Sequence, residues 1–263
     1  MAPVESAVQE TKRPPAFSFI QGPLGCLLVH GFGDTAALME PMGEYLRAED
    51  ISARGITLPG HGSSLKEFAS VSNQRLLGVV EAEYLELKKC CDSVVVVGFS
   101  MGGLLALQLA TLREVDGIVT ICAPMFPRGG PAGEKVIRLA SKVAGAFGAD
   151  LPKMGFTSLS DKSLSRYLTG HERYPFRSIY RLIELMETTR HVLQRVTSPI
   201  LVAQSRRDDV IWKKSGEYLL RSVNSARKEI VFLENSRHKA PIDGDRHFLF
   251  EKIHKFSLDL AKK

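Results

Sequence analysis

One stretch of sequence decides the fold class: Val94-Val95-Val96-Val97-Gly98-Phe99-Ser100-Met101-Gly102-Gly103-Leu104-Leu105-Ala106. A continuous run of β-branched residues is typical of a strand that is buried on both faces of a parallel sheet. The apolar run that begins at Met101 predicts a helix as far as Leu112, so the strand and the helix meet with almost no loop. Ser100 stands at the junction in the pattern G-x-S-x-G. Glycines on both sides remove side chains that would collide in so sharp a turn, and the hydroxyl of Ser100 would then project from its tip.

Strand and helix patterns alternate along the rest of the chain. We expect strands at 24–29, 51–58, 117–122, 199–203 and 229–233, and helices at 40–48, 74–89 and 245–262. Strands that alternate with helices predict an α/β fold with a mostly parallel central sheet and helices on both faces. The alternation stops between 125 and 197, which shows helical patterns, the largest at about 178–196, and no convincing strand. The predicted organisation is a flexible tail (1–15), a core (16–124 and 198–263) and a helical cap inserted in the core (125–197).

The composition is that of an ordinary soluble globular protein. The chain has 263 residues, of which 44% are hydrophobic and 24% charged, and its length suits one large α/β domain. The net charge of +6 comes from scattered basic residues and not from a long block, so it predicts no nucleic-acid partner. The four cysteines match neither a zinc pattern nor a disulfide framework. No stretch approaches the roughly 18 apolar residues of a membrane span, and the first 15 residues lack the apolar segment of a signal peptide. We therefore expect a cytoplasmic monomer or homodimer without stable membrane insertion.

A serine hydroxyl is a weak nucleophile and needs a base, which in turn needs an orienting acid. Among the seven histidines, His238 is our candidate base, because it follows the strand 229–233 by a short loop. The acid is sought after the strand 199–203, where Asp208 and Asp209 are neighbours. We choose Asp208, because Ile211 then lies three residues further on and can pack inward behind the acid loop. Asp209 remains the alternative.

The tetrahedral intermediate that forms when a serine attacks a carbonyl carbon also needs two N–H donors for its oxyanion. We expect one from the backbone of Met101, at the start of the helix, and one from Phe32 in the loop His30-Gly31-Phe32-Gly33. The alternative for this loop is an ordinary glycine-rich turn. Further apolar residues near the expected site or in the cap could line a substrate pocket, or could be ordinary core residues: Met39, Met125, Phe126, Met154 and Phe156.

Four motifs together resemble the α/β-hydrolase superfamily over about residues 17–260, and more closely the small bacterial carboxylesterases and monoacylglycerol lipases. They are Leu28-Val29-His30-Gly31-Phe32, Gly60-His61-Gly62, Gly98-Phe99-Ser100-Met101-Gly102 and Ile118-Val119-Thr120-Ile121-Cys122-Ala123-Pro124-Met125. The chain order Ser100, Asp208, His238 is the order of that superfamily. The sequence departs from those esterases at Arg237, where they often have glycine before the catalytic histidine, and in its longer N-terminal tail.

The resemblance implies a serine hydrolase that acts on short- to medium-chain acyl esters or monoacylglycerols through an acyl-enzyme, with no metal or organic cofactor. A lysophospholipase, thioesterase or amidase would use the same residues and is the alternative. A non-enzymatic ligand-binding protein on this fold is a remote alternative, since such proteins usually lose a member of the triad. A nucleic-acid or membrane-surface role based on net charge has no basic-aromatic motif to support it.

Overall fold

The structure is a computed structural model that describes residues 17–153, 159 and 162–261. The predicted tail (1–15) and two of the predicted pocket residues, Met154 and Phe156, lie outside the described residues.

The core of the molecule is a seven-stranded sheet in the order β1-β3-β2-β4-β5-β8-β9. All neighbouring strands are parallel except β1 and β3, which are antiparallel. This confirms the predicted mostly parallel sheet, to which the structure adds the short edge strand β1. The strands are β1 (Phe17–Phe19), β2 (Leu24–Val29), β3 (Ser52–Ile56), β4 (Ser93–Phe99), β5 (Gly117–Ile121), β8 (Ile200–Ser205) and β9 (Lys228–Leu233).

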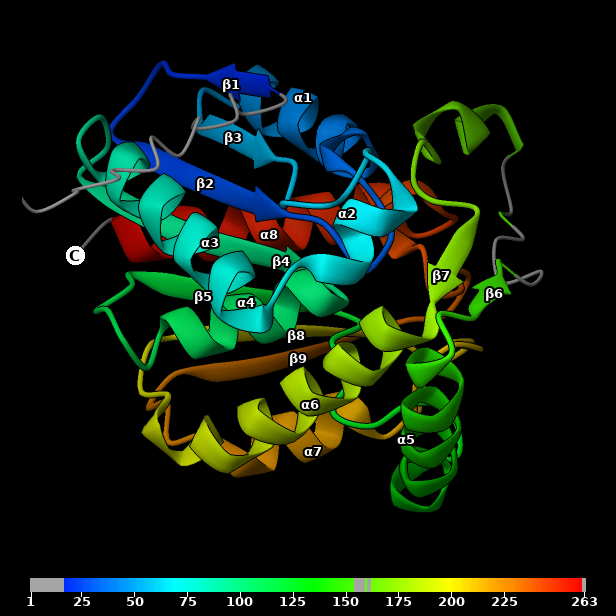
Figure 1. Cartoon of the computed structure of the whole chain (residues 1–263). Coiled ribbons are helices and arrows are strands. Elements are labelled where there is room, and N and C mark those ends of the chain that lie inside the picture. The colour runs from blue at the N-terminus through cyan, green and yellow to red at the C-terminus, as the bar shows by residue number, and fades with distance from the viewer. Residues whose placement is uncertain (1–16, 154–158, 160–161, 262–263) are drawn as a thin grey trace, which may run out of the picture.

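Helices cover both faces of the sheet (Figure 1). Alternate valines of β4 pack in two different cores: Val94 and Val96 pack with α3, α4, α6 and α7, whereas Val95 and Val97 pack with α1 and α8. Since both faces of the strand are buried, all four positions are apolar, which explains the unbroken valine run. The helices are α1 (Glu40–Ala48), α3 (Asn73–Lys88), α4 (Met101–Leu109), α6 (Phe176–Val192), α7 (Ser215–Ser222) and α8 (Arg246–Ala261).

The segment between β5 and β8 corresponds to the predicted cap. It contains α5 (Gly130–Ala146), β6 (Asp150–Pro152), the 3-10 helix η2 (Lys162–Tyr167), β7 (Arg173–Pro175), α6 and the 3-10 helix η3 (Leu193–Arg195). Its strands β6 and β7 lie beyond the carboxyl ends of the parallel strands, whereas its helix α6 packs against α3 and α4 on one face of the sheet (Figure 1). Strands β6 and β7 form an antiparallel pair that the sequence did not predict. Each is three residues long and ends in proline, so neither shows the alternation by which a strand is recognised.

Three short elements complete the edge of the sheet at which the strands end. These are the 3-10 helix η1 (Ala36–Met39) after β2, the helix α2 (Leu65–Ser70) after β3, and the 3-10 helix η4 (Ala240–Ile242) after β9. None of the described helices is both long enough and apolar enough to cross a bilayer.

Candidate active site

Ser100 occupies a strained turn between β4 and α4. Its backbone has φ 52° and ψ −117°, which an L-residue rarely adopts. Its N–H donates to the carbonyl of Ile121 at 2.8 Å, which ties the turn to β5. A Cβ on Gly98 would lie 2.2 Å from the carbonyl oxygen of Gly102, and a Cβ on Gly102 would lie 2.2 Å from that of Val29. Both positions therefore exclude any side chain. The close approach of these backbone segments holds Ser100 at the tip of the turn.

His238 lies between Ser100 and Asp208. Its Nε2 is 3.1 Å from the Ser100 Oγ, and its Nδ1 is 2.8 Å from the Asp208 Oδ2. The three residues come from three different loops after β4, β8 and β9, and all three side chains are buried. The imidazole packs against the ring of Phe99, with 5.2 Å between the ring centres. In the tautomer with its proton on Nδ1, the ring donates to the carboxylate and Nε2 accepts from the Ser100 hydroxyl, which is the arrangement that lets a histidine take a proton from serine.

The environment of Asp208 keeps its carboxylate charged. Burial alone would raise its pKa, but attraction and hydrogen bonding from His238 and two backbone N–H groups outweigh burial and hold the pKa below its usual value. The two N–H groups belong to Val210 and Ile211, at 2.9 and 3.0 Å from Oδ1. The carboxylate is therefore held on both sides, because Oδ1 accepts from the backbone of its own loop and Oδ2 is hydrogen-bonded to His238.

Cys122 stands next to this pair, and its sulfur lies within 4.8 Å of potential metal-ligand atoms of Asp208 and His238. Burial first, and then the nearby Asp208 carboxylate, raise the pKa of the Cys122 thiol well above its usual value. A protonated thiol is a poor metal ligand, and the two other groups already use their facing atoms on each other. The donor set fits a hydrogen-bonded pair beside a neutral thiol better than a metal centre.

Asp209, the alternative acid, points to a different partner. Its Oδ2 accepts a hydrogen bond from the Arg237 guanidinium at 2.9 Å, and this ion pair is partly exposed. The same contact gives a structural role to Arg237, which stands before His238 where the esterases that the sequence resembles often have glycine. Arg237 thus joins the acid loop to the histidine loop at the surface.

The loop after β2 is shaped by His30 and Asp34. The Nε2 of His30 accepts from the Leu58 N–H at 3.0 Å, and Asp34 N–H donates to the Gly31 carbonyl at 3.2 Å. The Asp34 carboxylate is paired with the Lys239 ammonium at 2.6 Å, and both side chains are almost fully buried. This pair connects the loop that carries Phe32 to the loop that carries His238, and the sequence offered no signal for it.

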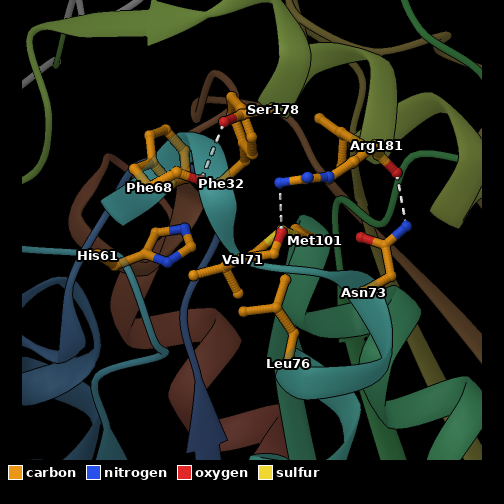
Figure 2. A pocket seen from close by; sticks show the side chains of 10 residues that line it. Phe32, His61, Phe68, Val71, Asn73, Leu76, Met101, Ser178 and Arg181 are labelled. Carbon is orange, nitrogen blue, oxygen red and sulfur yellow. Dashed lines mark hydrogen bonds between the residues drawn. The ribbon is translucent and has the colours of Figure 1, made fainter. Parts of the chain in front are cut away.

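A small pocket lies beside Met101, the residue that follows Ser100 in the chain (Figure 2). Phe32 and Met101, the two residues expected to donate N–H groups to an oxyanion, both line it. The other walls come from the loop after β3, the α2–α3 region and α6 of the cap, and Figure 2 shows these side chains surrounding one space. They are His61, Phe68, Val71, Asn73, Leu76, Ser178, Arg181 and Leu182.

Among the described residues that line this pocket, the Nε2 of His61 is the one buried side-chain nitrogen or oxygen without a hydrogen-bond partner. Its Nδ1 lies 3.0 Å from the Pro59 carbonyl. Burial, and secondarily the nearby His30, lower the pKa of His61 to about 3, and burial lowers the pKa of His30 to about 4. Both rings are therefore neutral near pH 7, and the His61 Nε2 is a hydrogen-bond acceptor.

The cap segment contacts the Phe32 loop directly. The His171 N–H donates to the Gly33 carbonyl at 2.8 Å, and the Tyr174 ring lies 5.2 Å from the Phe32 ring. A Cβ on Gly33, where φ is +72°, would lie 2.3 Å from the Tyr174 ring. The position of β7 in the cap is thus coupled to the loop that carries Phe32, through residues that sequence reasoning did not single out.

The described residues of the predicted pocket are not among those that line this cavity. Met39 and Met125 are fully buried in the two cores, and neither lines this cavity. Phe126 packs edge-on against Trp212 and Tyr218, below the Arg190 guanidinium at 4.1 Å from its ring centre. Whether these residues contact a substrate stays a prediction.

Comparisons with known proteins agree with this architecture. The family described as serine aminopeptidase, S33, matches residues 25–245. The chain is 31% identical to a thermostable monoacylglycerol lipase of Bacillus sp. (strain H-257), over 89% of this chain and 90% of that protein. It is 25% identical to a carboxylesterase of Bacillus subtilis (strain 168), over 92% and 96% of the two chains. A solved structure of a metagenome-derived lipolytic enzyme superposes with a TM-score of 0.83 at 26% identity, and covers 95% of this chain and 98% of its own.

Proposed function

The chain belongs to the serine aminopeptidase S33 family of α/β-hydrolases and is an esterase-type hydrolase, and from this premise we propose that it cleaves short- to medium-chain acyl esters or monoacylglycerols with Ser100 as nucleophile. The observation that carries the proposal is the position of His238, within hydrogen-bond distance of both Ser100 and Asp208. A base with a free Nε2 beside a strained serine is what nucleophilic acyl transfer requires.

In the first step, the Ser100 Oγ attacks the ester carbonyl carbon while the His238 Nε2 takes the hydroxyl proton. The backbone N–H groups of Phe32 and Met101 donate to the oxyanion of the tetrahedral intermediate. The intermediate collapses when His238 returns the proton to the leaving alcohol oxygen, and the acyl group stays on Ser100. Asp208 keeps the imidazole oriented and stabilises its charged form.

In the second step, water enters and His238 takes one of its protons. The resulting nucleophile attacks the acyl carbon, and the same two N–H groups hold the second oxyanion. Collapse of this intermediate breaks the bond to Ser100, whose Oγ regains the proton from His238. The carboxylic acid then leaves, and every proton taken by His238 has been returned.

The apolar lining of the pocket supports an acyl ester as substrate. Phe68, Val71, Leu76 and Leu182 supply apolar walls directly beside the two proposed oxyanion donors. The names of the relatives, a monoacylglycerol lipase and a carboxylesterase, support the same substrate class.

The test compares Ser100→Ala with the wild type on p-nitrophenyl butyrate. The expected loss in kcat is about 10⁶-fold, because the nucleophile is removed. Ser165→Ala, at an exposed serine of η2, is the matched control and should keep full activity. A rate unchanged in Ser100→Ala would refute the proposal.

A second measurement defines the substrate. Rates on p-nitrophenyl esters of rising acyl length and on monoacylglycerols should show a maximum at short to medium length. Faster turnover of lysophospholipids, thioesters or amides than of any p-nitrophenyl ester or monoacylglycerol would replace the proposed substrate class while keeping Ser100.

A further inference from the structure

Basic side chains that are scattered along the sequence gather on one surface around the acid loop. Three segments carry them: 126–128 at the start of the cap, 205–214 at the end of β8 and beyond it, and 234–237 after β9. These segments contain six basic residues and three acids, a balance of +3, which is half of the net charge of +6 of the whole chain. The six basic side chains are all exposed, and we call them the basic surface: Arg128, Arg206, Arg207, Lys213, Lys214 and Arg237.

Hydrogen bonds hold the three segments side by side. The Arg128 N–H donates to the Val210 carbonyl at 3.2 Å, which attaches the start of the cap to the acid loop. The Arg206 N–H donates to the Leu233 carbonyl at 3.0 Å, which attaches the acid loop to the end of β9. The ion pair of Asp209 with the histidine loop joins the same two segments at the surface. The basic surface is therefore continuous, although its residues come from three distant parts of the chain.

Two arginines of the basic surface are already ordered by their own neighbours. The Nε of Arg206 donates to a Glu234 carboxylate oxygen at 3.0 Å, and its guanidinium lies 3.8 Å from the ring centre of Phe232. Arg237 is held by Asp209. A guanidinium has five N–H donors, so each arginine can still bind another carboxylate. A side chain that is ordered in advance loses less entropy when a partner binds.

Three other cations of the basic surface are not neutralised. No ion pair is found for Arg207, Lys213 or Lys214 among the described residues, and all three side chains are exposed. Exposed charges of one sign create a potential that extends over about 8 Å at physiological ionic strength. Such a potential attracts an acidic partner and speeds its association.

The composition of the basic surface favours a protein partner. None of the large hydrophobic side chains that are exposed among the described residues belongs to the three segments, so they offer nothing to insert into a bilayer. Arginine beside partly buried aromatic rings, here Phe232 and Trp212, is typical of protein–protein interfaces. The surface acids Asp209 and Glu234 would repel a nucleic-acid backbone, which carries a charge at every phosphate, whereas a protein can place neutral side chains opposite them.

The basic surface also lies on the two loops that hold the proposed acid and base. Arg207 directly precedes Asp208, and Arg237 directly precedes His238. We propose that the basic surface binds the acidic surface of a partner protein, whose aspartate and glutamate side chains pair with its arginines and lysines. This docking goes beyond the proposed hydrolysis and can be measured without it.

Poly-L-glutamate represents the acidic partner in the test. Full-length protein is added to the fluorescently labelled polymer, and binding is measured by fluorescence anisotropy at low and at physiological ionic strength. The wild type should bind at low ionic strength and more weakly at physiological ionic strength. Binding should also change the emission of Trp212, the only tryptophan of the chain, because it lies in the segment that carries Lys213 and Lys214.

A triple variant removes the three unpaired cations: Arg207→Gln, Lys213→Gln and Lys214→Gln. An exposed ion pair contributes about twofold to threefold to affinity, so the triple variant should bind poly-L-glutamate about tenfold more weakly. The matched control removes the same number of charges at exposed lysines of α2, α5 and α8 and should bind as the wild type does. Its substitutions are Lys66→Gln, Lys142→Gln and Lys255→Gln.

Hydrolysis of p-nitrophenyl butyrate should be the same in the wild type and both variants, so this assay reports the proposed function separately. The docking proposal is overturned if the triple variant binds the polymer as tightly as the wild type does. It is also overturned if the control loses as much affinity as the triple variant, since net charge alone would then explain the binding. Tighter binding of duplex DNA or of phosphatidylglycerol vesicles than of poly-L-glutamate would overturn it as well, because the surface would then select phosphate groups.

Discussion

The buried ion pair between Lys239 and Asp34 offers the sharpest test of how the site is held together. We predict that Lys239→Met destabilises the fold and slows hydrolysis, although Lys239 makes no proposed contact with substrate. Asp34 follows Phe32 by two residues and Lys239 follows His238 directly, so the pair ties together the two loops on which the oxyanion donor and the base depend. Phe99 packs between them, since it contacts the His238 ring and lies under the Lys239 ammonium.

The size of the effect follows from burial. The two side chains are 9% and 2% exposed, and an ammonium nitrogen is 2.6 Å from a carboxylate oxygen. At this distance the attraction is roughly 6 kcal/mol at an effective dielectric constant of about 20. Desolvation of each ion costs several kcal/mol, so the intact pair adds little net stability, but removal of one partner leaves an uncompensated charge and costs about 3–5 kcal/mol. That is a large part of the roughly 5–15 kcal/mol by which a domain is stable.

The assay is urea unfolding followed by the fluorescence of Trp212, the only tryptophan of the chain, at several pH values. Burial alone would raise the pKa of Asp34, but the attraction of Lys239 outweighs it and holds the pKa below its usual value. In the wild type the contribution of Asp34 to stability is therefore present above the unfolded pKa and is lost as pH falls through the folded one. In Lys239→Met the attraction is gone and burial raises the pKa of Asp34 instead, so the difference in unfolding free energy between wild type and variant should shrink as pH falls from 7 toward 4.

The double variant Asp34→Asn with Lys239→Met is the control, because it leaves no buried charge. It should recover at least about 2 kcal/mol relative to Lys239→Met. The reasoning is refuted if Lys239→Met costs less than about 1 kcal/mol, or if the double variant is no more stable than the single one. A loss of kcat that persists after stability is recovered would show that the pair also positions the two loops.

Three further predictions concern the turn, the acid and the buried histidines. Asp208→Asn should lower kcat about 10⁴-fold on p-nitrophenyl butyrate because it favours the wrong tautomer of the base, whereas Asp209→Asn should change the rate by less than about tenfold. Gly98→Ala, whose Cβ would lie 2.2 Å from a backbone oxygen, should destabilise the protein by more than about 3 kcal/mol in urea unfolding; a wild-type midpoint would contradict the geometry of the turn. Because burial lowers the pKa values of His30 and His61 to about 4 and about 3, only the unfolded chain binds these protons between about pH 6.5 and 4. The free energy of unfolding should therefore decrease as pH falls through this window, by about 1.4 kcal/mol per pH unit for each ring. His61→Gln should halve this part of the pH dependence, as measured by unfolding midpoints from pH 7 to 5.

Much of the fold was readable from local patterns. The valine run before Ser100 predicted a strand buried on both faces, and the two cores that receive alternate valines confirm it. Parallel strands end at one edge of a sheet, so residues that follow strands far apart in the chain could be expected to meet there. The structure brings Ser100, Asp208 and His238 within hydrogen-bond distance at this edge.

Elements with weak local signals were not predicted. The strands β1, β6 and β7 have three residues each, too few for a periodic pattern, and they form because a partner strand lies beside them. Apolar character alone does not distinguish a cavity wall from packed interior, so the pocket role of Met39 and Met125, which lie in the two cores, stays a prediction.

The sequence by itself determined which chemical groups follow which strand, because periodicity and glycine placement are local properties of the chain. Only the tertiary structure decided how those groups are used. It directs Asp208 to His238 and Asp209 to Arg237, although the two acids are neighbours, and it joins Asp34 to Lys239 across 205 positions. It also turns the apolar side of α5 outward, since helical spacing shows that a face is apolar but not which side of the helix the protein covers. Each of these outcomes depends on contacts between segments far apart in the chain, which no local pattern contains.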